Sequence, residues 1–459
     1  MTRLLSWLLN LMWCGVLLAV SPVVLYRCLR HGKYRHSLRE RFLGALPRSV
    51  QTSSTVPRYW FHAVSVGEVL LLETVLKEMT ERQPAAEFVI SATTHTGLDV
   101  ARRRFPDHTV CCFPLDFSWA VRQAIQRIRP TQIVLVELEL WPNFILEAAR
   151  TKTPLSLING RLSERSFRGY SRAGWLMRRL IRSFDRIAVQ NTDYARRFEA
   201  LGAPVDRVTV TGSVKYDRVA TDRSNFRTDS LRTIFGLPAG DPVFVAGSTV
   251  EPEEQIVLDA WQSVRRQHPQ LRLILVPRHA ERFESVAQLV TARGLPLQRR
   301  SQSVGTDLPS ATAPHSDPSS LSGGRPSETP PVILLDTLGE LSACWGLADF
   351  AFVGGSMARR GGQNMIEPAG YGAAICFGPD TRNFRDVVDA LLACRAARVV
   401  SSSAHMENTL QAWLASPESA AAQGRRAQNF VLSQLGATAK TVDCLLGPAP
   451  QKCSSRRVA

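Results

Sequence analysis

The fold class of this chain is clearest in residues 58–91, which read RYWFHAVSVGEVLLLETVLKEMTERQPAAEFVIS. This stretch begins with a short apolar run at 59–63, continues with apolar side chains at helical spacing over 68–82, and ends in a second apolar run at 88–91. This periodicity predicts a buried strand, an amphipathic helix and a second buried strand. Because a strand, a helix and a strand in succession form a parallel β-α-β unit, the stretch indicates an α/β fold.

The same alternation of short apolar runs and amphipathic segments extends outward from this stretch. It continues to about residue 211, and a second series begins after residue 218. We therefore predict two Rossmann-like domains, at 29–218 and 219–440, each built on a doubly wound parallel sheet. Ligands of such sheets bind beyond the carboxyl ends of the strands, so we expect the two domains to face an interdomain cleft.

Two segments lack the composition of a folded core. Residues 301–330 contain 8 Ser, 5 Pro and 3 Gly among 30 residues, with almost no large apolar side chain. The tail after Gly447 is similarly poor in core residues, and we place the flexible segment at 441–459. Because such segments bury too little apolar surface to offset the entropy of ordering, we predict a disordered insert and a flexible tail.

The amino end predicts a membrane anchor. Residues 4–26 carry no charge, and as a helix they would be about 34 Å long, enough to cross a hydrocarbon core of about 30 Å. Only Arg3 precedes this run, whereas seven Lys or Arg and one Glu follow within 27–48, so the positive-inside rule places the rest of the chain in the cytoplasm. The alternative is a signal peptide cleaved at Ala19-Val-Ser21, which the basic stretch opposes. We therefore predict a single anchor at 1–28.

Charge and cysteine content limit the classes of partner. The 56 Lys and Arg exceed the 40 Asp and Glu by 16, which indicates an anionic partner. The excess positive charge is concentrated in two clusters, at 27–48 and 161–182. The simpler interpretation of such clusters is a solvated helix face. The predicted anchor favours the alternative that they bind an anionic membrane surface. No helix-turn-helix, zinc-finger or RNP-like pattern occurs, so we expect no nucleic-acid binding. Nine cysteines without C-x-x-C spacing argue against a disulfide scaffold and a zinc site.

Candidate polar residues of the first domain follow its predicted strands. Ser65 and Glu68 have the spacing of a helix-capping box, and the alternative is that Glu68 is a general base at the cleft. The Thr-Thr-His-Thr-Gly stretch at 93–97 offers hydroxyls and free N–H groups to a carboxylate or sugar, or forms an ordinary N-cap. Glu137 and Glu139 follow a buried strand directly, and two residues apart on an extended chain they would point the same way.

The second domain repeats this arrangement with residues suited to a nucleotide phosphate. Polar or glycine-rich turns follow three of its predicted strands, at 246–249, 277–279 and 353–356, and another glycine-rich turn lies at 361–368. Glycines allow close backbone approach, helix N-termini supply N–H groups, and an arginine fork suits phosphate. Glu367 is placed to accept hydrogen bonds from ribose hydroxyls. No Walker sequence and no carboxylate or histidine cluster at metal spacing occurs.

Seven motifs occur in one order along the chain: H-x-V-S-V-G-E (62–68), E-x-E-L-W-P-N (137–143), N-x-R-L-S-x-R-S-x-x-G-Y (159–170), V-T-G-S-x-K-Y-D (210–217), L-I-L-V-P-R-H-x-E-R-F (273–283), F-V-G-G-S (352–356) and G-G-x-N-x-x-E-P (361–368). This set resembles the 3-deoxy-D-manno-octulosonic acid (Kdo) transferases of lipopolysaccharide synthesis. The resemblance covers about residues 20–435.

The resemblance implies a GT-B glycosyltransferase that moves Kdo from CMP-Kdo to a lipid A precursor, lipid IVA, at the cytoplasmic face of the inner membrane. It implies an inverting reaction without metal or cofactor, with Glu68 as catalytic base and Glu139 as a second required carboxylate. Gln363 stands where many members of the family have His. We assign two further groups of residues. The donor group is Ser248, Arg278, His279, Gly354, Gly355, Ser356, Asn364 and Glu367. The acceptor or sugar group is Ser65, Gly67, Thr94 and Arg161.

Two other functions are compatible with the sequence. One is a different nucleotide-sugar transferase or an epimerase of the same two-domain fold, which would use UDP-sugars in place of CMP-Kdo. The other is a membrane-anchored scaffold that recruits acidic partners through the basic clusters. The scaffold leaves the paired carboxylates and the phosphate-type motifs without a purpose, so we prefer the transferase.

Overall fold

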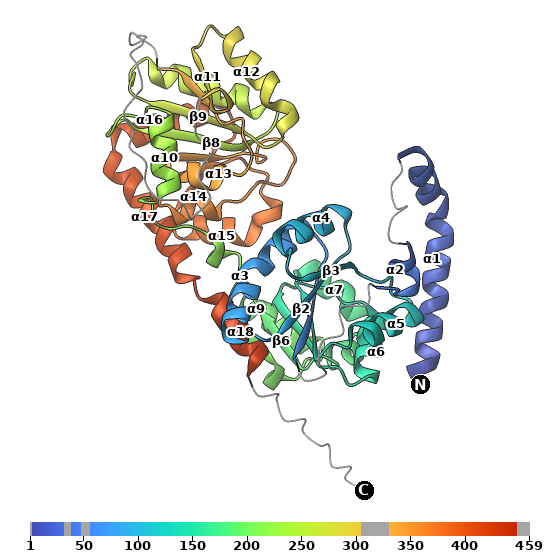
Figure 1. The fold of residues 1–459 in the computed structure, drawn as a ribbon. Coiled ribbons are helices and arrows are strands. Elements are labelled where there is room, and N and C mark those ends of the chain that lie inside the picture. Colours follow the sequence, from blue (N-terminus) through green and yellow to red (C-terminus); the bar gives the residue numbers. More distant parts are fainter. Residues whose placement is uncertain (1, 32–37, 47–55, 304–329, 448–459) are drawn as a thin grey trace. The chain divides into compact units, whose positions relative to one another are not determined.

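The computed structural model describes residues 2–31, 38–46, 56–303 and 330–447. The chain divides into two compact units, which we describe separately: unit 1 comprises Met1–Arg218 and Gln434–Ala459, and unit 2 comprises Val219–Ser433. Each unit is built on a seven-stranded sheet with helices packed against it (Figure 1). Most of the predicted insert at 301–330 and the end of the predicted tail lie outside the described residues.

The sheet of unit 1 has the strand order β3-β2-β1-β4-β5-β6-β7, and all its neighbouring strands run parallel. Apolar clusters cover both of its faces. The strands are β1 (Arg58–Ala63), β2 (Glu87–Ala92), β3 (Thr109–Cys112), β4 (Gln132–Val136), β5 (Leu155–Gly160), β6 (Arg186–Val189) and β7 (Val208–Val210). The helices are α1 (Thr2–His31), α2 (Leu38–Leu43), α3 (Val66–Arg82), α4 (His95–Arg104), α5 (Ser118–Ile128), α6 (Pro142–Arg150), α7 (Glu164–Arg172), α8 (Gly174–Ile181), α9 (Thr192–Ala200) and α18 (Ala437–Leu446).

The sheet of unit 2 is also parallel, with the order β10-β11-β9-β8-β12-β13-β14. Its strands are β8 (Val243–Thr249), β9 (Arg272–Pro277), β10 (Leu297–Arg299), β11 (Val332–Leu334), β12 (Phe350–Val353), β13 (Ala374–Phe377) and β14 (Ala397–Val399). Its helices are α10 (Phe226–Ile234), α11 (Glu253–Arg265), α12 (Phe283–Ala292), α13 (Leu341–Cys344), α14 (Ile366–Gly370), α15 (Arg385–Ala393), α16 (Ser403–Ala415) and α17 (Pro417–Ser433).

The predicted fold class, two parallel α/β sheets preceded by an apolar helix, is confirmed. The strand order reverses between β1 and β4 in unit 1 and between β8 and β12 in unit 2. In an open parallel sheet such a reversal opens a crevice beyond the carboxyl ends of the strands, where ligands bind. The predicted cleft between the two domains stays a prediction, and each of the two crevices is described below on its own unit.

The carboxyl-terminal helix α18 belongs to unit 1, whereas the sequence pattern placed residues up to 440 in the second domain and 441–459 in a flexible tail. The prediction of a flexible tail is wrong for residues 441–446, which are helical and pack against the first sheet. The apolar residues Ala437, Val442 and Leu445 of this helix join an apolar cluster on the first sheet. The carboxylate of Asp217 accepts hydrogen bonds from the backbone N–H groups of Gly436 and Thr438. The helix is therefore held by both apolar packing and capping of its N-terminal N–H groups.

Helix α1 contains one stretch, Leu4–Pro22, that is long and apolar enough to cross a membrane, with a mean hydropathy of 1.9. Its length and composition agree with the predicted anchor, although a signal sequence has the same properties. In Figure 1 this helix runs beside α2, α5 and α6 of unit 1, so it is packed along one side against the first unit.

Candidate active site

Glu68 lies in the first turn of α3, directly beyond the carboxyl end of β1. Its Oε2 accepts a hydrogen bond from the Val64 N–H at 2.8 Å, and its Oε1 accepts one from the Ser65 hydroxyl at 2.9 Å. The arrangement differs from a standard capping box because the Ser65 side chain accepts no backbone N–H of the helix. Burial raises the pKa of Glu68, and the nearby charge of Glu137 raises it further.

Glu139 lies beyond the end of β4, the strand next to β1. Its Oε2 accepts a hydrogen bond from the Trp141 indole at 2.8 Å. Burial is the main cause that raises the pKa of Glu139 to about 7, and the negative charge of Glu68 adds to it. The two carboxylates that the sequence selected thus interact electrostatically, at the reversal point of the first sheet.

Glu137 has a different partner from Glu139. Its backbone has a φ of 62°, so the chain leaves the extended conformation here, and the prediction that the two carboxylates point the same way rested on the wrong local geometry. Glu137 Oε1 lies 2.7 Å from Lys215 Nζ. Asn159 donates a long hydrogen bond of 3.5 Å to the same oxygen.

Lys215 is a site residue that the sequence reasoning did not assign. It follows β7 and comes within reach of the carboxylates only because the strands that carry these residues lie in one sheet. Its positive charge lowers the pKa of Glu68 and so opposes the effect of burial. The sequence indicated a functional role for Lys215 only through its place in the V-T-G-S-x-K-Y-D motif. No spacing along the chain predicts that it pairs with Glu137.

We expect Lys215→Met to raise the pKa of Glu68 because a stabilising positive charge is removed. The sequence predicts Glu68 as a general base, and a base works only when it is deprotonated, so we expect the acid limb of kcat/KM for the predicted transfer reaction to move to higher pH. The measurement is the pH profile of kcat/KM with Lys215→Arg as the matched control, which keeps the charge and should leave the limb close to that of the unchanged protein. An unmoved limb in Lys215→Met would contradict the electrostatic link.

The remaining predicted residues of unit 1 also follow the carboxyl ends of strands in the first sheet. Thr94 caps α4, because its hydroxyl accepts the Gly97 N–H at 3.1 Å, and it donates to the Val64 carbonyl. Gly67 is exposed in the first turn of α3, where an added Cβ would meet only the Ser65 hydroxyl, at 3.9 Å. Arg161 directly follows β5 and is half-buried. The N-cap role of Thr94 is thus observed, and sugar binding by these residues stays a prediction.

In unit 2 the predicted donor residues gather at the carboxyl ends of the adjacent strands β9, β8 and β12. Arg278 follows β9, and burial together with the charge of Arg360 lowers its pKa. In the described part of the chain neither arginine pairs with an acidic side chain. Two arginines that repel each other without a carboxylate partner form a site suited to an anion. Arg360 was not selected from the sequence.

The glycine-rich turn at 353–356 differs from the prediction that its N–H groups bind phosphate. Glu253, fully buried at the start of α11, accepts hydrogen bonds from four N–H groups: Oε2 from Val250 and Gly355, at 2.9 and 2.7 Å, and Oε1 from Ser356 and Met357, both at 2.8 Å. The next helix after the turn is α14, which begins only at residue 366, so no helix N-terminus adjoins the turn.

The individual residues of this turn have structural roles. A Cβ on Gly354 would come within 2.6 Å of the Ser248 carbonyl oxygen, so the turn approaches the end of β8 as closely as only glycine allows. Gly355 has a φ of +66°, which also favours glycine. The Ser356 hydroxyl is buried and donates to the Val353 carbonyl. Contact of these three residues with the CMP-sugar donor stays a prediction. Their backbone N–H groups are no longer candidates for the phosphate ligands.

Other predicted donor residues remain accessible. Ser248 is half-buried at the end of β8, with a φ of 55°, and His279 is exposed. Asn364 donates a hydrogen bond of 2.8 Å to the Glu367 carboxylate, and its own Oδ1 accepts the Ile366 N–H. Asn364 therefore orients Glu367 at the start of α14, which is compatible with the predicted role of Glu367 toward ribose hydroxyls.

The two reversed parallel sheets define the GT-B class of fold. The chain is similar to the crystal structure of UDP-GlcNAc 2-epimerase from Neisseria meningitidis, with a TM-score of 0.56, 12% identity, and coverage of 85% of this chain and 100% of that chain. At that identity the likeness shows the fold alone.

Sequence comparison gives the particular family. Residues 36–218 match the family described as 3-Deoxy-D-manno-octulosonic-acid transferase (kdotransferase). The chain is 33% identical to the 3-deoxy-D-manno-octulosonic acid transferase of Bordetella pertussis over 84% of its length and 86% of that protein. It is 29% identical to the enzyme of the same name from Haemophilus influenzae over 94% of its length and 97% of that protein. The chain belongs to the Kdo transferase family.

Proposed function

We propose that this chain transfers Kdo from CMP-Kdo to a lipid A precursor, lipid IVA, with inversion at the transferred carbon and without a metal ion. Membership of the Kdo transferase family supports the reaction class. The observation that carries the mechanism is the group of Glu68, Glu139 and the Glu137–Lys215 pair at the reversal point of the first sheet. In the proposed reaction, the acceptor hydroxyl lies at this reversal point and loses its proton to a carboxylate there.

Glu68 is the proposed general base. Hydrogen bonds from Val64 and Ser65 fix the orientation of its carboxylate, and each oxygen keeps a further lone pair for an acceptor hydroxyl. Its raised pKa makes it a stronger base than a solvated carboxylate. In an inverting transfer Glu68 takes the hydroxyl proton as the oxygen attacks the anomeric carbon of Kdo and the bond from that carbon to the CMP phosphate breaks.

The departing phosphate needs positive charge. Arg278 and Arg360 supply it in unit 2, since they lie close enough to influence each other and lack acidic partners in the described chain. Glu367, oriented by a hydrogen bond from Asn364, is the proposed acceptor of hydrogen bonds from the ribose hydroxyls. Among the described residues no group of three His, Cys, Asp or Glu side chains is arranged to hold a metal ion.

We also propose that the protein is held at the cytoplasmic face of the inner membrane by α1. The apolar side chains Trp7, Leu11 and Leu18 on the helix are each more than two-thirds exposed. Most of the arginines in the 161–182 cluster are exposed on or beside α7 and α8, where anionic headgroups would attract them.

The test is incubation of detergent-purified protein with CMP-Kdo and a tetra-acylated lipid A precursor in EDTA, followed by mass spectrometry of the lipid. One or more Kdo-sized increments are expected, and their number counts the additions. A parallel incubation with UDP-sugars examines the alternative transferase or epimerase. Product only with a UDP-sugar, or none with CMP-Kdo from well-folded protein, would refute the proposed donor and acceptor.

Gly67→Ala gives an independent check on where the substrates lie. Nothing within the described chain except the Ser65 hydroxyl, at 3.9 Å, stands near an added Cβ, and alanine favours a helix over glycine by up to about 1 kcal/mol. We expect an unchanged or slightly raised Tm together with a KM for one substrate raised about tenfold or more. Unaltered kinetics would indicate that neither substrate contacts this turn.

A further inference from the structure

Helix α1 presents one face to unit 1. Leu9 and Asn10 are each only 6% exposed, and Leu5, Trp13 and Leu17 are half-buried. Spacings of four residues along 5, 9, 13 and 17 place those four side chains on one face of a helix, and Asn10, three residues before Trp13, borders the same face. The first half of the apolar run is therefore docked on α5 and α6 along that face (Figure 1).

The docked face is held by polar contacts as well as apolar ones. Asn10 Nδ2 donates to the Ser118 hydroxyl at 2.8 Å, and Asn10 Oδ1 accepts the Ser118 N–H at 3.0 Å and the Asn143 side-chain amide at 3.2 Å. Trp13 Nε1 donates to Asp116 at 3.2 Å. A side-chain amide is costly in hydrocarbon unless its hydrogen bonds are made, and here unit 1 makes them.

These contacts lead to the carboxylate site. Asp116 accepts the backbone N–H groups of Asn143 and Phe144, at 3.0 and 2.8 Å, and so fixes the first turn of α6. The residue before that helix is Trp141, whose ring centroid lies 6.1 Å from that of Trp13. The Trp141 indole is the hydrogen-bond donor to Glu139.

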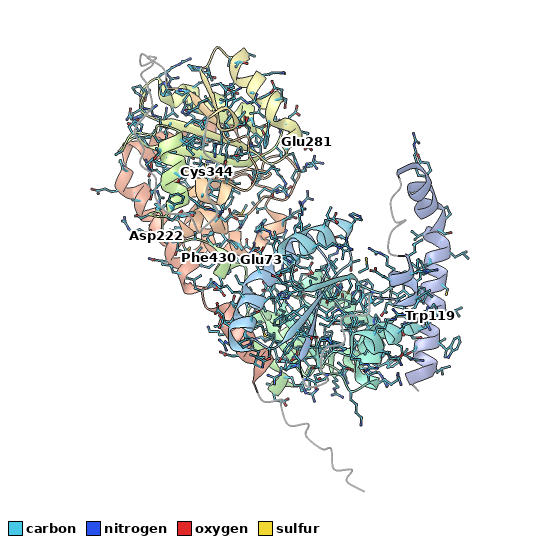
Figure 2. All side chains as sticks on the ribbon, viewed as in Figure 1. Glu73, Trp119, Asp222, Glu281, Cys344 and Phe430 are labelled. Carbon is cyan, nitrogen blue, oxygen red and sulfur yellow. The ribbon has the colours of Figure 1, made fainter. Side chains whose placement is uncertain are left out.

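We infer that α1 is a positioning element of the active site: Asn10 and Trp13 hold Asp116, the start of α6 and the Trp141 indole in the arrangement that orients Glu139. The inference rests on the proposed function, in which Glu139 is required for transfer. It gives the apolar helix a second role beside membrane attachment. Trp119, the residue after Ser118 that is labelled in Figure 2, donates its indole N–H to the Phe42 carbonyl.

The first experiment asks whether the helix is docked in the membrane-bound protein. Asn10→Cys and Ser118→Cys are combined in the full chain, inner membranes are treated with a short bis-maleimide, and peptide mass mapping identifies the link. Because the two native side chains are hydrogen-bonded at 2.8 Å, we expect the 10–118 link to form. Absence of that link while each single cysteine reacts with maleimide would overturn the inference, whatever the reaction catalysed.

The second experiment measures positioning. Asn10→Leu makes the helix more apolar and so preserves membrane attachment, Trp13→Phe keeps a ring but removes the N–H donor, and Met12→Ala changes a side chain that is 49% exposed on the same helix. We expect kcat in detergent to fall about tenfold in the first two and to remain unchanged in Met12→Ala. Trp13→Phe is the milder change, and its kcat tests the inference if the Asn10→Leu protein does not fold.

The pH profile distinguishes positioning from a general loss of stability. The Trp141 hydrogen bond lowers the pKa of Glu139, and the charged or ionisable groups that face Glu139 are Glu68, Glu137 and Tyr170. If α1 positions the indole, Asn10→Leu and Trp13→Phe move the pH profile in the same direction as Trp141→Phe. An unchanged profile in both, with a shift in Trp141→Phe, would overturn the inference and leave the proposed function intact. Full activity in Glu139→Gln would overturn both.

Discussion

Glu68→Gln is expected to lower kcat for Kdo transfer about 10³-fold, because an amide cannot take the proton of the acceptor hydroxyl. The fold should be preserved, since the Gln carbonyl oxygen can still accept the Val64 N–H and the Ser65 hydroxyl can rotate to accept from the amide. The measurement is the single-turnover rate with CMP-Kdo and lipid IVA, alongside Tm.

The matched control for this variant is Glu78→Gln on the same helix. Glu78 is paired with Arg82 at the other end of α3, away from β1, so its change should leave the rate within about twofold. A Glu68→Gln protein with full activity would mean that Glu68 only caps its helix. Loss of activity with a lowered Tm would mean that the residue is structural first.

The second large effect is expected in unit 2 from Glu253→Gln. The carboxylate accepts four backbone N–H groups, two on each oxygen, whereas the amide offers one oxygen and places an NH2 group against the other pair. Two buried donors without acceptors cost about 1–3 kcal/mol each, so we expect a loss of about 2–6 kcal/mol in the free energy of unfolding.

Hydrogen exchange locates this effect. The amides of residues 355–357 should exchange faster in Glu253→Gln, and the KM for CMP-Kdo should rise because the turn contains the proposed donor residues 354–356 and lies against the proposed donor residue Ser248. Glu281→Gln is the control, since Glu281 is largely exposed at the surface of unit 2 (Figure 2). Unchanged protection at 355–357 would show that the buried carboxylate does not hold the turn.

Much of the fold follows from the sequence because parallel strands buried on both faces are nearly continuous apolar runs. The runs at 59–63 and 88–91 correspond to β1 and β2 within one residue at each end. Two strands escaped the prediction, β10 and β14, which lie at the two edges of the second sheet and are three residues long. Edge strands this short carry too few residues to show a period.

Most of the candidate site was predicted where its residues follow strands. Glu68, Glu139 and Arg278 were selected because strand ends are where polar residues meet ligands in this fold, and Glu367 because an acidic residue binds the ribose hydroxyls in nucleotide folds. Glu253 was visible only as an acidic residue at a helix start, and no pattern indicated that its carboxylate would occupy the N–H groups of a turn about 100 residues away. Such a contact depends on the pairing of β8 with β12.

The sequence by itself therefore determined the α/β periodicity, the order of the motifs, the family and the strand-end residues, since each depends on neighbours along the chain. The tertiary structure decided that Lys215 pairs with Glu137 across 78 residues, that α18 returns to the first unit, and that Asn10 of the apolar helix is hydrogen-bonded to Ser118. These are contacts between segments far apart in the sequence. They exist only because packing, burial and the satisfaction of buried polar groups act on the folded chain as a whole.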